Sequence, residues 1–189
     1  KLVDTKSFQR VIRTLCLSFG VLIAFYTTSD FGTSSFAAES NSNYVDDARI
    51  INSFENEPGN WLSYGQYYKE QRFSHLTQIT PDNADRMGLA WSTTIGDYNM
   101  RMSGTPLVVD GVMYVSNGWS VVYALDATNG EEIWRYDPEV DRSYIRLACC
   151  GPAHNRGVAA YQGKVYVATF DGRLLAIDAS TGEKVWDID

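Results

Sequence analysis

A repeat with a period of 52 residues is the feature that most limits what this chain can fold into. The pentapeptide at residues 111–115 recurs, with three identical residues, at residues 163–167. The same shift, without a gap, superimposes the motif Ala-x-Asp-Ala-x-x-Gly-Glu-x-x-Trp of residues 124–134 on that of residues 176–186. Self-similarity at a fixed period of this length is typical of folds in which one supersecondary unit is used several times.

Each repeat unit predicts four short strands joined by tight turns. In the first unit the predicted strands cover residues 105–109, 112–117, 120–125 and 131–136. The Asp-Gly pair at residues 110–111 lies between two apolar runs, which is a signal for a β-hairpin. No segment of the chain shows a convincing helical period. Four antiparallel strands in about 40–50 residues are typical of a propeller blade, so we expect an all-β protein, a β-propeller of four-stranded antiparallel blades.

One tryptophan in each unit, Trp134 or Trp186, follows the Ala-x-Asp motif at a constant distance. We expect these side chains to pack between neighbouring blades and to specify the fold, with no role in chemistry. Trp91 is expected to end an earlier, irregular blade. Two or three blades cannot close into a ring, because known propellers have at least about four. We therefore expect residues 60–189 to be the first blades of a longer propeller, truncated after residue 189.

The N-terminal part of the chain has the pattern of an export signal. Basic residues precede an uncharged run at residues 14–29, and small residues follow up to Ala38. This order is typical of a secretory signal peptide. Residues 1–38 are therefore predicted to be one, cleaved near Ala37 or Ala38, and the mature protein is predicted to be periplasmic. A retained membrane anchor is the alternative, but the uncharged run is shorter than the ~20 apolar residues of a spanning helix.

Composition sets expectations for partners and for the segment after the leader. Acidic residues outnumber basic ones, 23 to 16, and the net charge is −7. This excess argues against nucleic acid or an anionic membrane as a partner, since both attract clustered Lys and Arg. No membrane span is predicted in the mature chain. Residues 39–59 are predicted to form an N-terminal arm, which is expected to be flexible over the polar residues 41–49.

The connections between units are the places where chemistry is expected. In a propeller the chain returns from the outer strand of one blade to the inner strand of the next, toward the central channel. Here these connections cover about residues 95–104 and 138–156. The 52-residue register puts Ser103 of the first connection opposite Asn155 of the second. No Ser-His-Asp set, cluster of metal ligands or phosphate-binding glycine loop is visible in the sequence.

The second connection carries the unusual residues. Cys149 and Cys150 are adjacent, and neighbouring Cα atoms lie ~3.8 Å apart, below the usual ~4.4–6.8 Å span of a disulfide. They could form a strained, flat disulfide ring in an exported protein, remain as two reduced buried thiols or, less well, bind a metal. Arg156 could bind a carboxylate through its planar guanidinium or form an ordinary surface ion pair. His154 could be a base or a solvated side chain.

Taken together, these residues resemble the pyrroloquinoline quinone (PQQ)-dependent alcohol and methanol dehydrogenase family. The similar stretches are Asn-Trp-Leu-Ser-Tyr-Gly at residues 60–65, Thr-Pro-Leu-Val-Val-Asp-Gly-Val-Met-Tyr at residues 105–114, the cysteine pair followed by Asn-Arg-Gly at residues 155–157, and the two tryptophan motifs. The tryptophan motifs also occur in non-enzymatic propellers, whereas the cysteine pair ahead of Asn-Arg-Gly is much more specific. The resemblance covers about residues 60–189 and implies an eight-bladed propeller in the full-length protein.

The resemblance also implies roles for particular residues. In this family the adjacent cysteines form a disulfide that lies against one face of PQQ, and the arginine after the pair binds a PQQ carboxylate. These roles fall on Cys149, Cys150 and Arg156. Ser103 stands where the family usually has a glutamate that contacts the quinone, so we expect PQQ to bind with one altered contact. The spacer of residues 151–154 is one residue longer than the usual form.

The function implied by the resemblance is that of a periplasmic PQQ-dependent alcohol dehydrogenase, which oxidises small alcohols to aldehydes and passes electrons to a periplasmic cytochrome c. The family's calcium or lanthanide ligands and its catalytic aspartate fall beyond residue 189, so this chain alone is expected to be inactive. A C-terminal domain with haem c is compatible with the resemblance. The alternatives are a non-catalytic propeller scaffold of the outer-membrane assembly type, and a quinoprotein that acts on sugars or polymeric alcohols.

Overall fold

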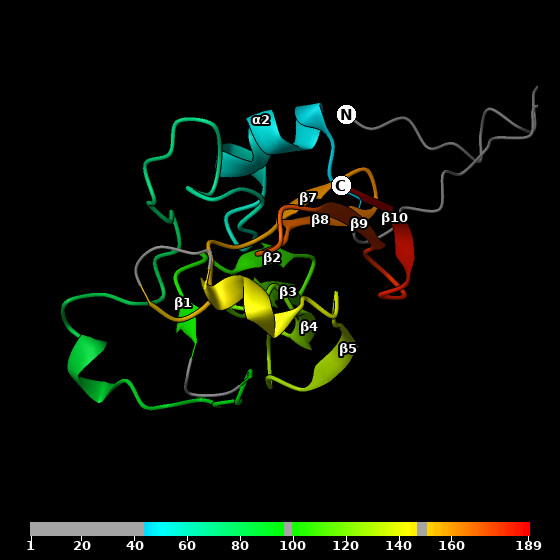
Figure 1. Ribbon diagram of the computed structural model, residues 1–189. Helices are drawn as coiled ribbons and strands as arrows, with labels where there is room; N and C mark the ends of the chain where they lie inside the picture. Colours follow the sequence, from blue (N-terminus) through cyan, green and yellow to red (C-terminus); the bar gives the residue numbers. More distant parts are fainter. Residues whose placement is uncertain (1–43, 97–99, 147–150) are drawn as a thin grey trace, which may run out of the picture. The chain divides into compact units, whose positions relative to one another are not determined.

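Two four-stranded antiparallel sheets make up most of the structure. The computed structural model describes residues 44–96, 100–146 and 151–189 (Figure 1). The first sheet has the order β2-β3-β4-β5 and consists of β2 (Leu107–Val109), β3 (Val112–Ser116), β4 (Val122–Asp126) and β5 (Glu132–Tyr136). From its inner edge outward, the second sheet has the order β7-β8-β9-β10 and consists of β7 (Ala159–Tyr161), β8 (Lys164–Ala168), β9 (Leu174–Asp178) and β10 (Lys184–Ile188). These sheets are the two predicted blades, and the all-β prediction is confirmed.

The first hairpin of each blade turns where the sequence predicts it. Asp110 and Gly111 both have positive φ angles, 51° and 84°. Gln162 and Gly163 repeat this in the second blade, with 47° and 70°. A two-residue loop with positive φ at both positions has a twist that matches the strands on either side. The turn therefore fixes the register of the first two strands in each blade.

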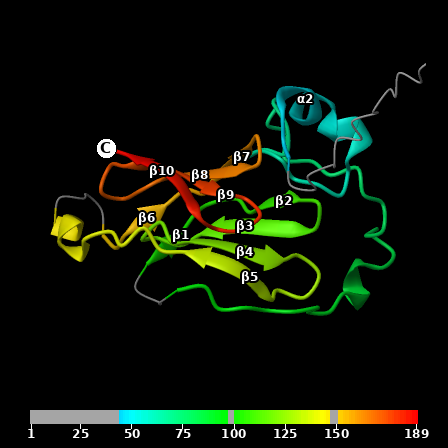
Figure 2. The same ribbon diagram turned by 90° about the vertical axis from the view of Figure 1, so that its right-hand side faces the viewer.

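The two blades pack face to face and share one hydrophobic core. Its buried residues include Tyr114, Val122, Ala124 and Trp134 from the first blade and Val165, Val167, Leu175 and Ile177 from the second. Because side chains of a strand alternate between its two faces, each sheet turns one apolar side toward the other. Figure 2 shows the second sheet lying over the first. Burial of this shared apolar surface is the main favourable contribution to holding the two blades together.

Trp134 joins the blades as the repeat predicts. Only 8% of the residue is exposed, and its indole N–H donates to Ala179 O of the second blade at 3.0 Å. Gly182 leaves space for the ring, because a Cβ atom there would lie 2.8 Å from it. Trp91 makes the equivalent contact on the first blade, donating to Ala127 O at 3.2 Å. Trp91 therefore docks on the first blade as Trp134 docks on the second, although it lies in no strand; that it ends an earlier blade stays a prediction.

A helix precedes the blades, contrary to the expectation from the sequence. α2 (Asp47–Asn56) begins after Asp46, whose side chain accepts a hydrogen bond from Arg49 N at 2.8 Å. The helix buries Ile50 and Ser53. The sequence shows no convincing helical period here, and the expectation of a flexible arm is wrong for residues 47–49, which begin the helix. Two buried positions give a helix too weak an apolar period to be recognised, and such a helix depends on tertiary contacts for its stability.

Contacts of Arg49 and of the backbone attach this helical segment to both blades. The Arg49 guanidinium donates to Glu57 at 2.9 Å and to Asp110, in the first hairpin, at 2.9 Å. The hydrogen bond from Arg49 holds the pKa of Glu57 below its usual value. At the second blade, Gln162 N donates to Val45 O at 2.7 Å. The segment therefore bridges the first hairpins of the two blades.

The remaining short elements lie in the connections. The 3₁₀ helices are η1 (Ala84–Arg86), before the first blade, and η2 (Arg142–Arg146), between the blades. Within the described ranges, no helix has the length and apolar character needed to cross a bilayer. A parallel pair of very short strands, β1 (Arg101–Met102) and β6 (His154–Asn155), joins the two connections. This pair positions the candidate site.

Candidate cofactor site

The two connections between blades run side by side at β1 and β6 (Figure 2). The strands are parallel, with Arg101 opposite His154. Directly after β1, Ser103 N donates to Asn155 O at 3.4 Å. The repeat made Ser103 and Asn155 equivalent positions of two units, and the structure brings them into contact. The predicted site residues Ser103 and Arg156 are therefore neighbours in space.

Asn155 fixes this strand pair to both blades. Its side chain is buried, with the residue 6% exposed. The carboxamide oxygen accepts from Ser116 Oγ at 2.7 Å and from Gly157 N at 2.9 Å. The amide nitrogen donates to Ser120 Oγ at 3.0 Å and to Ala168 O at 2.9 Å. These bonds use the full hydrogen-bonding capacity of the side chain. The sequence prediction treated Asn155 only as part of a motif and missed this role, for which no local pattern gives a signal.

Two glycines allow the connections to touch. A Cβ atom on Gly104 would lie 2.7 Å from Gly157 Cα and 3.0 Å from the carbonyl carbon of Arg156, so no side chain fits there. Gly157 has a φ angle of 114°, which residues with a Cβ atom rarely adopt. Arg156 consequently lies between Asn155, which is anchored in the blades, and a close backbone contact with the first connection.

Four polar side chains share the outer face of the β1–β6 pair. Successive side chains point to opposite sides of a strand. Since Asn155 points into the blades, strand alternation puts His154 and Arg156 on the other side of the strand, where Arg156 is exposed and His154 is half-buried. Arg101 lies beside His154 in the parallel register, and Ser103, two residues after Arg101, lies on the same side. Arg101, Ser103 and Arg156 are exposed. His154 Nε2 is buried and has no hydrogen-bond partner among the described residues.

Positive charge on this face is not neutralised within the described structure. Among the described residues, the ion pairs involve Arg49, Arg135, Arg173 and Lys184. None of them includes Arg101 or Arg156. The surface ion pair considered as an alternative for Arg156 is therefore absent from the described part of the chain. A guanidinium binds a carboxylate through two parallel N–H donors. The face is suited to an anionic ligand that carries carboxylates.

The cysteine pair lies outside the described residues, so the disulfide between Cys149 and Cys150 stays a prediction. The structure resumes at Gly151, which follows the pair directly. A Cβ atom built on Gly151 would lie 3.9 Å from Arg101 Nη2. The Arg101 guanidinium therefore reaches the residue next to the cysteines.

The start of the second connection is anchored as well. The Arg142 guanidinium, in η2, lies 4.2 Å from the ring centroid of Trp119. Trp119 packs edge to face against Phe170, with ring centroids 5.4 Å apart. An exposed cation–π contact contributes about 0.5–1 kcal/mol. The connection is thus attached at η2 and again at Asn155, on either side of the cysteine pair.

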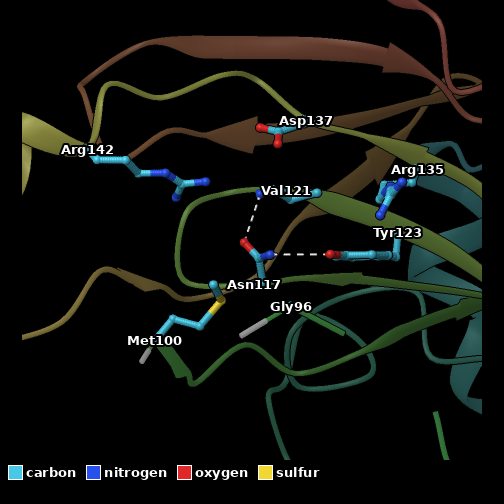
Figure 3. Close-up of a pocket in the computed structure, with 8 residues that line it drawn as sticks. All are labelled: Gly96, Met100, Asn117, Val121, Tyr123, Arg135, Asp137 and Arg142. Atoms are coloured by element: carbon cyan, nitrogen blue, oxygen red, sulfur yellow. Dashed lines mark hydrogen bonds between the residues drawn. The ribbon is translucent and has the colours of Figure 1, made fainter. Parts of the chain in front are cut away.

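A pocket of about 290 Å³ lies between the first blade and residues of both connections. It is lined by Gly96, Met100, Asn117, Val121, Tyr123, Arg135, Asp137 and Arg142 (Figure 3). The Asn117 amide at its centre is used internally, since it donates to Tyr123 Oη at 3.4 Å and accepts from Val121 N at 3.1 Å. Neither Ser103 nor Arg156 lines the pocket, which is therefore distinct from the predicted site. Within the described residues, no group of three or more His, Cys, Asp or Glu side chains is arranged to hold a metal ion.

Comparison with known proteins identifies the family. The quinohemoprotein alcohol dehydrogenase ADH-IIG of Pseudomonas putida is 52% identical over 158 residues, which make up 84% of this chain and 21% of that protein. Residues 61–187 match the PQQ family described as "Glucose/ethanol/alcohol dehydrogenase, beta-propeller domain". The chain belongs to the PQQ-dependent alcohol dehydrogenase family. Its two sheets are accordingly blades of a PQQ-dehydrogenase propeller, as the resemblance implied.

Further relatives agree in fold and family. The solved structure of ADHIIG from Pseudomonas putida HK5 matches with a TM-score of 0.74 and 53% identity, over 78% of this chain and 21% of that chain. A europium-containing methanol dehydrogenase matches with a TM-score of 0.60 and 34% identity, over 73% of this chain and 24% of that chain. The 1-butanol dehydrogenase (cytochrome c) of Thauera butanivorans is 51% identical over 129 residues, which are 68% of this chain and 18% of that protein. The chain thus spans about a fifth of the length of the relatives it matches.

Proposed function

We propose that this chain acts as part of a PQQ-dependent alcohol dehydrogenase that oxidises alcohols to aldehydes. The observation that carries the proposal is the outer face of the β1–β6 pair, where Arg156 lies beside Ser103 without an acidic partner in the described structure. PQQ bears carboxylates, and the donors of this face fit them. When bound, PQQ supplies the redox chemistry by taking up the electrons of the alcohol, while the protein binds and orients it.

The residues of the two connections have different tasks in this proposal. Arg156 holds a carboxylate of PQQ, and Asn155 holds the backbone that carries Arg156. Ser103 supplies one hydroxyl and no charge, in the place where the family usually has a glutamate. Cys149 and Cys150 form a flat disulfide against one face of the cofactor, since polarisable sulfur packs well on an aromatic ring.

Arg156→Lys is expected to weaken PQQ binding roughly ten- to hundredfold, because the loss of one charge-assisted hydrogen bond costs ~1.5–3 kcal/mol. An ammonium group cannot reproduce the two-pronged contact of a guanidinium. Absorbance titration of the intact protein with PQQ measures the dissociation constant, and alcohol-dependent reduction of added cytochrome c measures the activity.

Arg86→Lys is the matched control, since Arg86 is an exposed arginine of η1 and its substitution should leave PQQ binding unchanged. An unchanged affinity in Arg156→Lys would refute the role of Arg156. A wild-type protein that takes up no PQQ at all would refute the proposed function.

The disulfide between Cys149 and Cys150 is supported by the adjacency of the residues, the predicted export to an oxidising compartment and the family. Intact-mass measurement after blocking of free thiols, with and without reductant, tests it. We expect no blocked thiols in the mature protein without reductant, and two after reduction. Two blocked thiols without reductant would contradict the disulfide.

We further propose that the protein is periplasmic, uses a calcium or lanthanide ion, and passes electrons to a cytochrome c. The leader pattern of residues 1–38 supports export. The relatives named for europium and for cytochrome c support the ion and the acceptor, and the quinohemoprotein names of others support haem c in the intact protein. Three measurements test these proposals. N-terminal sequencing of the mature protein tests export, metal analysis tests the ion, and the haem absorbance band tests haem c.

Two alternatives give different results in the same assays. A non-catalytic propeller scaffold would bind no PQQ, and it has no use for an adjacent cysteine pair ahead of Asn-Arg-Gly. A quinoprotein for sugars or polymeric alcohols would bind PQQ but would reduce the acceptor with those substrates in preference to small alcohols. The relatives named as alcohol dehydrogenases favour small alcohols as the substrate class.

A further inference from the structure

We infer that Arg101 is a second carboxylate-binding arginine of the cofactor site, beside Arg156. The inference rests on the proposed function, since it concerns how the same face holds PQQ. Arg101 belongs to the first connection, whereas Arg156, the arginine expected at this site, belongs to the second connection.

The strand pairing places Arg101 on the cofactor-binding face. Arg101 is opposite His154 in the parallel β1–β6 register, and side chains at opposite positions of neighbouring strands share a face. His154 and Arg156 flank Asn155, which points into the blades, so alternation along the strand puts Arg101 on the same side of the pair as Arg156.

The guanidinium of Arg101 also extends toward Gly151 of the second connection. The distance of 3.9 Å between Arg101 Nη2 and the Cβ position of Gly151 shows that the head group reaches the residue after Cys150. Its charge therefore lies close to the backbone of the second connection at Gly151.

The ion pairs of the chain show how differently its structural arginines are bonded. Arg49 is bonded to Glu57 and Asp110, and Arg173 is bonded to two further aspartates, Asp171 and Asp187. Arg101 is exposed and has no such partner among the described residues.

Ser103 explains why this cation stays available on the cofactor face. A residue two positions along an extended strand lies on the same face, so a glutamate at position 103 would be able to neutralise Arg101. Serine carries no charge and leaves the guanidinium available to an anion. We therefore expect the serine at position 103 to be the reason why the Arg101 guanidinium can bind an anionic ligand.

The test compares PQQ with its trimethyl ester, which has the same ring system and no carboxylate charge. Arg101→Gln is expected to weaken the binding of PQQ by the intact protein about tenfold, as for loss of a charge-assisted hydrogen bond. Binding of the ester should change by less than about threefold, because the contact is with a carboxylate. Arg101→Lys should fall between wild type and Arg101→Gln, and Arg86→Gln should match the wild type. Fluorescence or absorbance titration gives all these dissociation constants without reference to turnover.

The outcomes separate the two proposals. If Arg101→Gln binds PQQ as the wild type does while Arg156→Lys is weakened, Arg101 is no part of the site and the proposed function stands. If Arg101→Gln weakens PQQ and the ester equally, Arg101 supports the local structure and the inference also fails. If the wild type binds no PQQ, the proposed function itself fails.

Discussion

Trp134→Ala is expected to lower the free energy of unfolding by about 3 to 5 kcal/mol, the usual range for a buried tryptophan. The ring lies between the two blades, and its indole N–H donates to Ala179 O at 3.0 Å. Truncation leaves that carbonyl without this donor and opens a cavity against Gly182, which has no side chain to fill it. Urea unfolding of the intact protein, followed by circular dichroism and tryptophan fluorescence, measures the change.

Two further variants separate the causes. Trp134→Phe keeps an aromatic ring and loses the indole N–H, so we expect a smaller loss, about 1 to 2 kcal/mol, for one hydrogen bond and some ring volume. Tyr68→Ala removes an aromatic side chain that is 61% exposed and should change the stability by no more than about 0.5 kcal/mol. A Trp134→Ala protein as stable as Tyr68→Ala would show that the blades do not depend on this contact.

Asn155→Ala is expected to lower the free energy of unfolding by about 3 to 5 kcal/mol. Each buried hydrogen-bonding partner left unpaired costs ~1–3 kcal/mol, and the total is reduced because some of these partners can bond to water instead. Four groups lose their partner, namely Ser116 Oγ, Ser120 Oγ, Ala168 O and Gly157 N. The same change releases the backbone that holds Arg156. We therefore also expect weaker PQQ binding, by tenfold or more, as for loss of the Arg156 contact itself.

Asn52→Ala is the matched control for this effect. Asn52 is exposed on α2, and its side chain donates to Ala48 O at 2.7 Å. Its replacement should leave both the unfolding midpoint and the PQQ dissociation constant close to those of the wild type. If Asn155→Ala is destabilised but binds PQQ with unchanged affinity, Asn155 has a structural role only and does not position Arg156.

The fold could be predicted because its signals are local or periodic. The Asp110-Gly111 turn is encoded by two neighbouring residues, and the 52-residue period repeats it at Gln162-Gly163. The docking of Trp134 follows from a motif that keeps the tryptophan at one distance from Ala-x-Asp. The α2 helix was missed because its order depends on bonds between residues far apart in the chain, such as Arg49 with Asp110.

The candidate site could be predicted only in part. Ser103 and Arg156 were found because they lie at recognisable positions of the two connections, and the structure makes them neighbours. The importance of Asn155 could not be predicted, since three of its four partners are 13 to 39 residues away in sequence. No sequence pattern indicated a role for Arg101. Its position on the face follows from its pairing with His154, 53 residues later in the chain.

Periodicity and turn chemistry in the chain were thus sufficient for the blades, their strand order and the tryptophan between them. A blade is built from neighbours in sequence, and each hairpin specifies its own register. The α2 helix, the contact between the two connections and the choice of Asn155 as their anchor depended on the tertiary structure. Long-range packing decides such contacts, since a buried amide is stable only where the folded chain brings all its hydrogen-bond partners together.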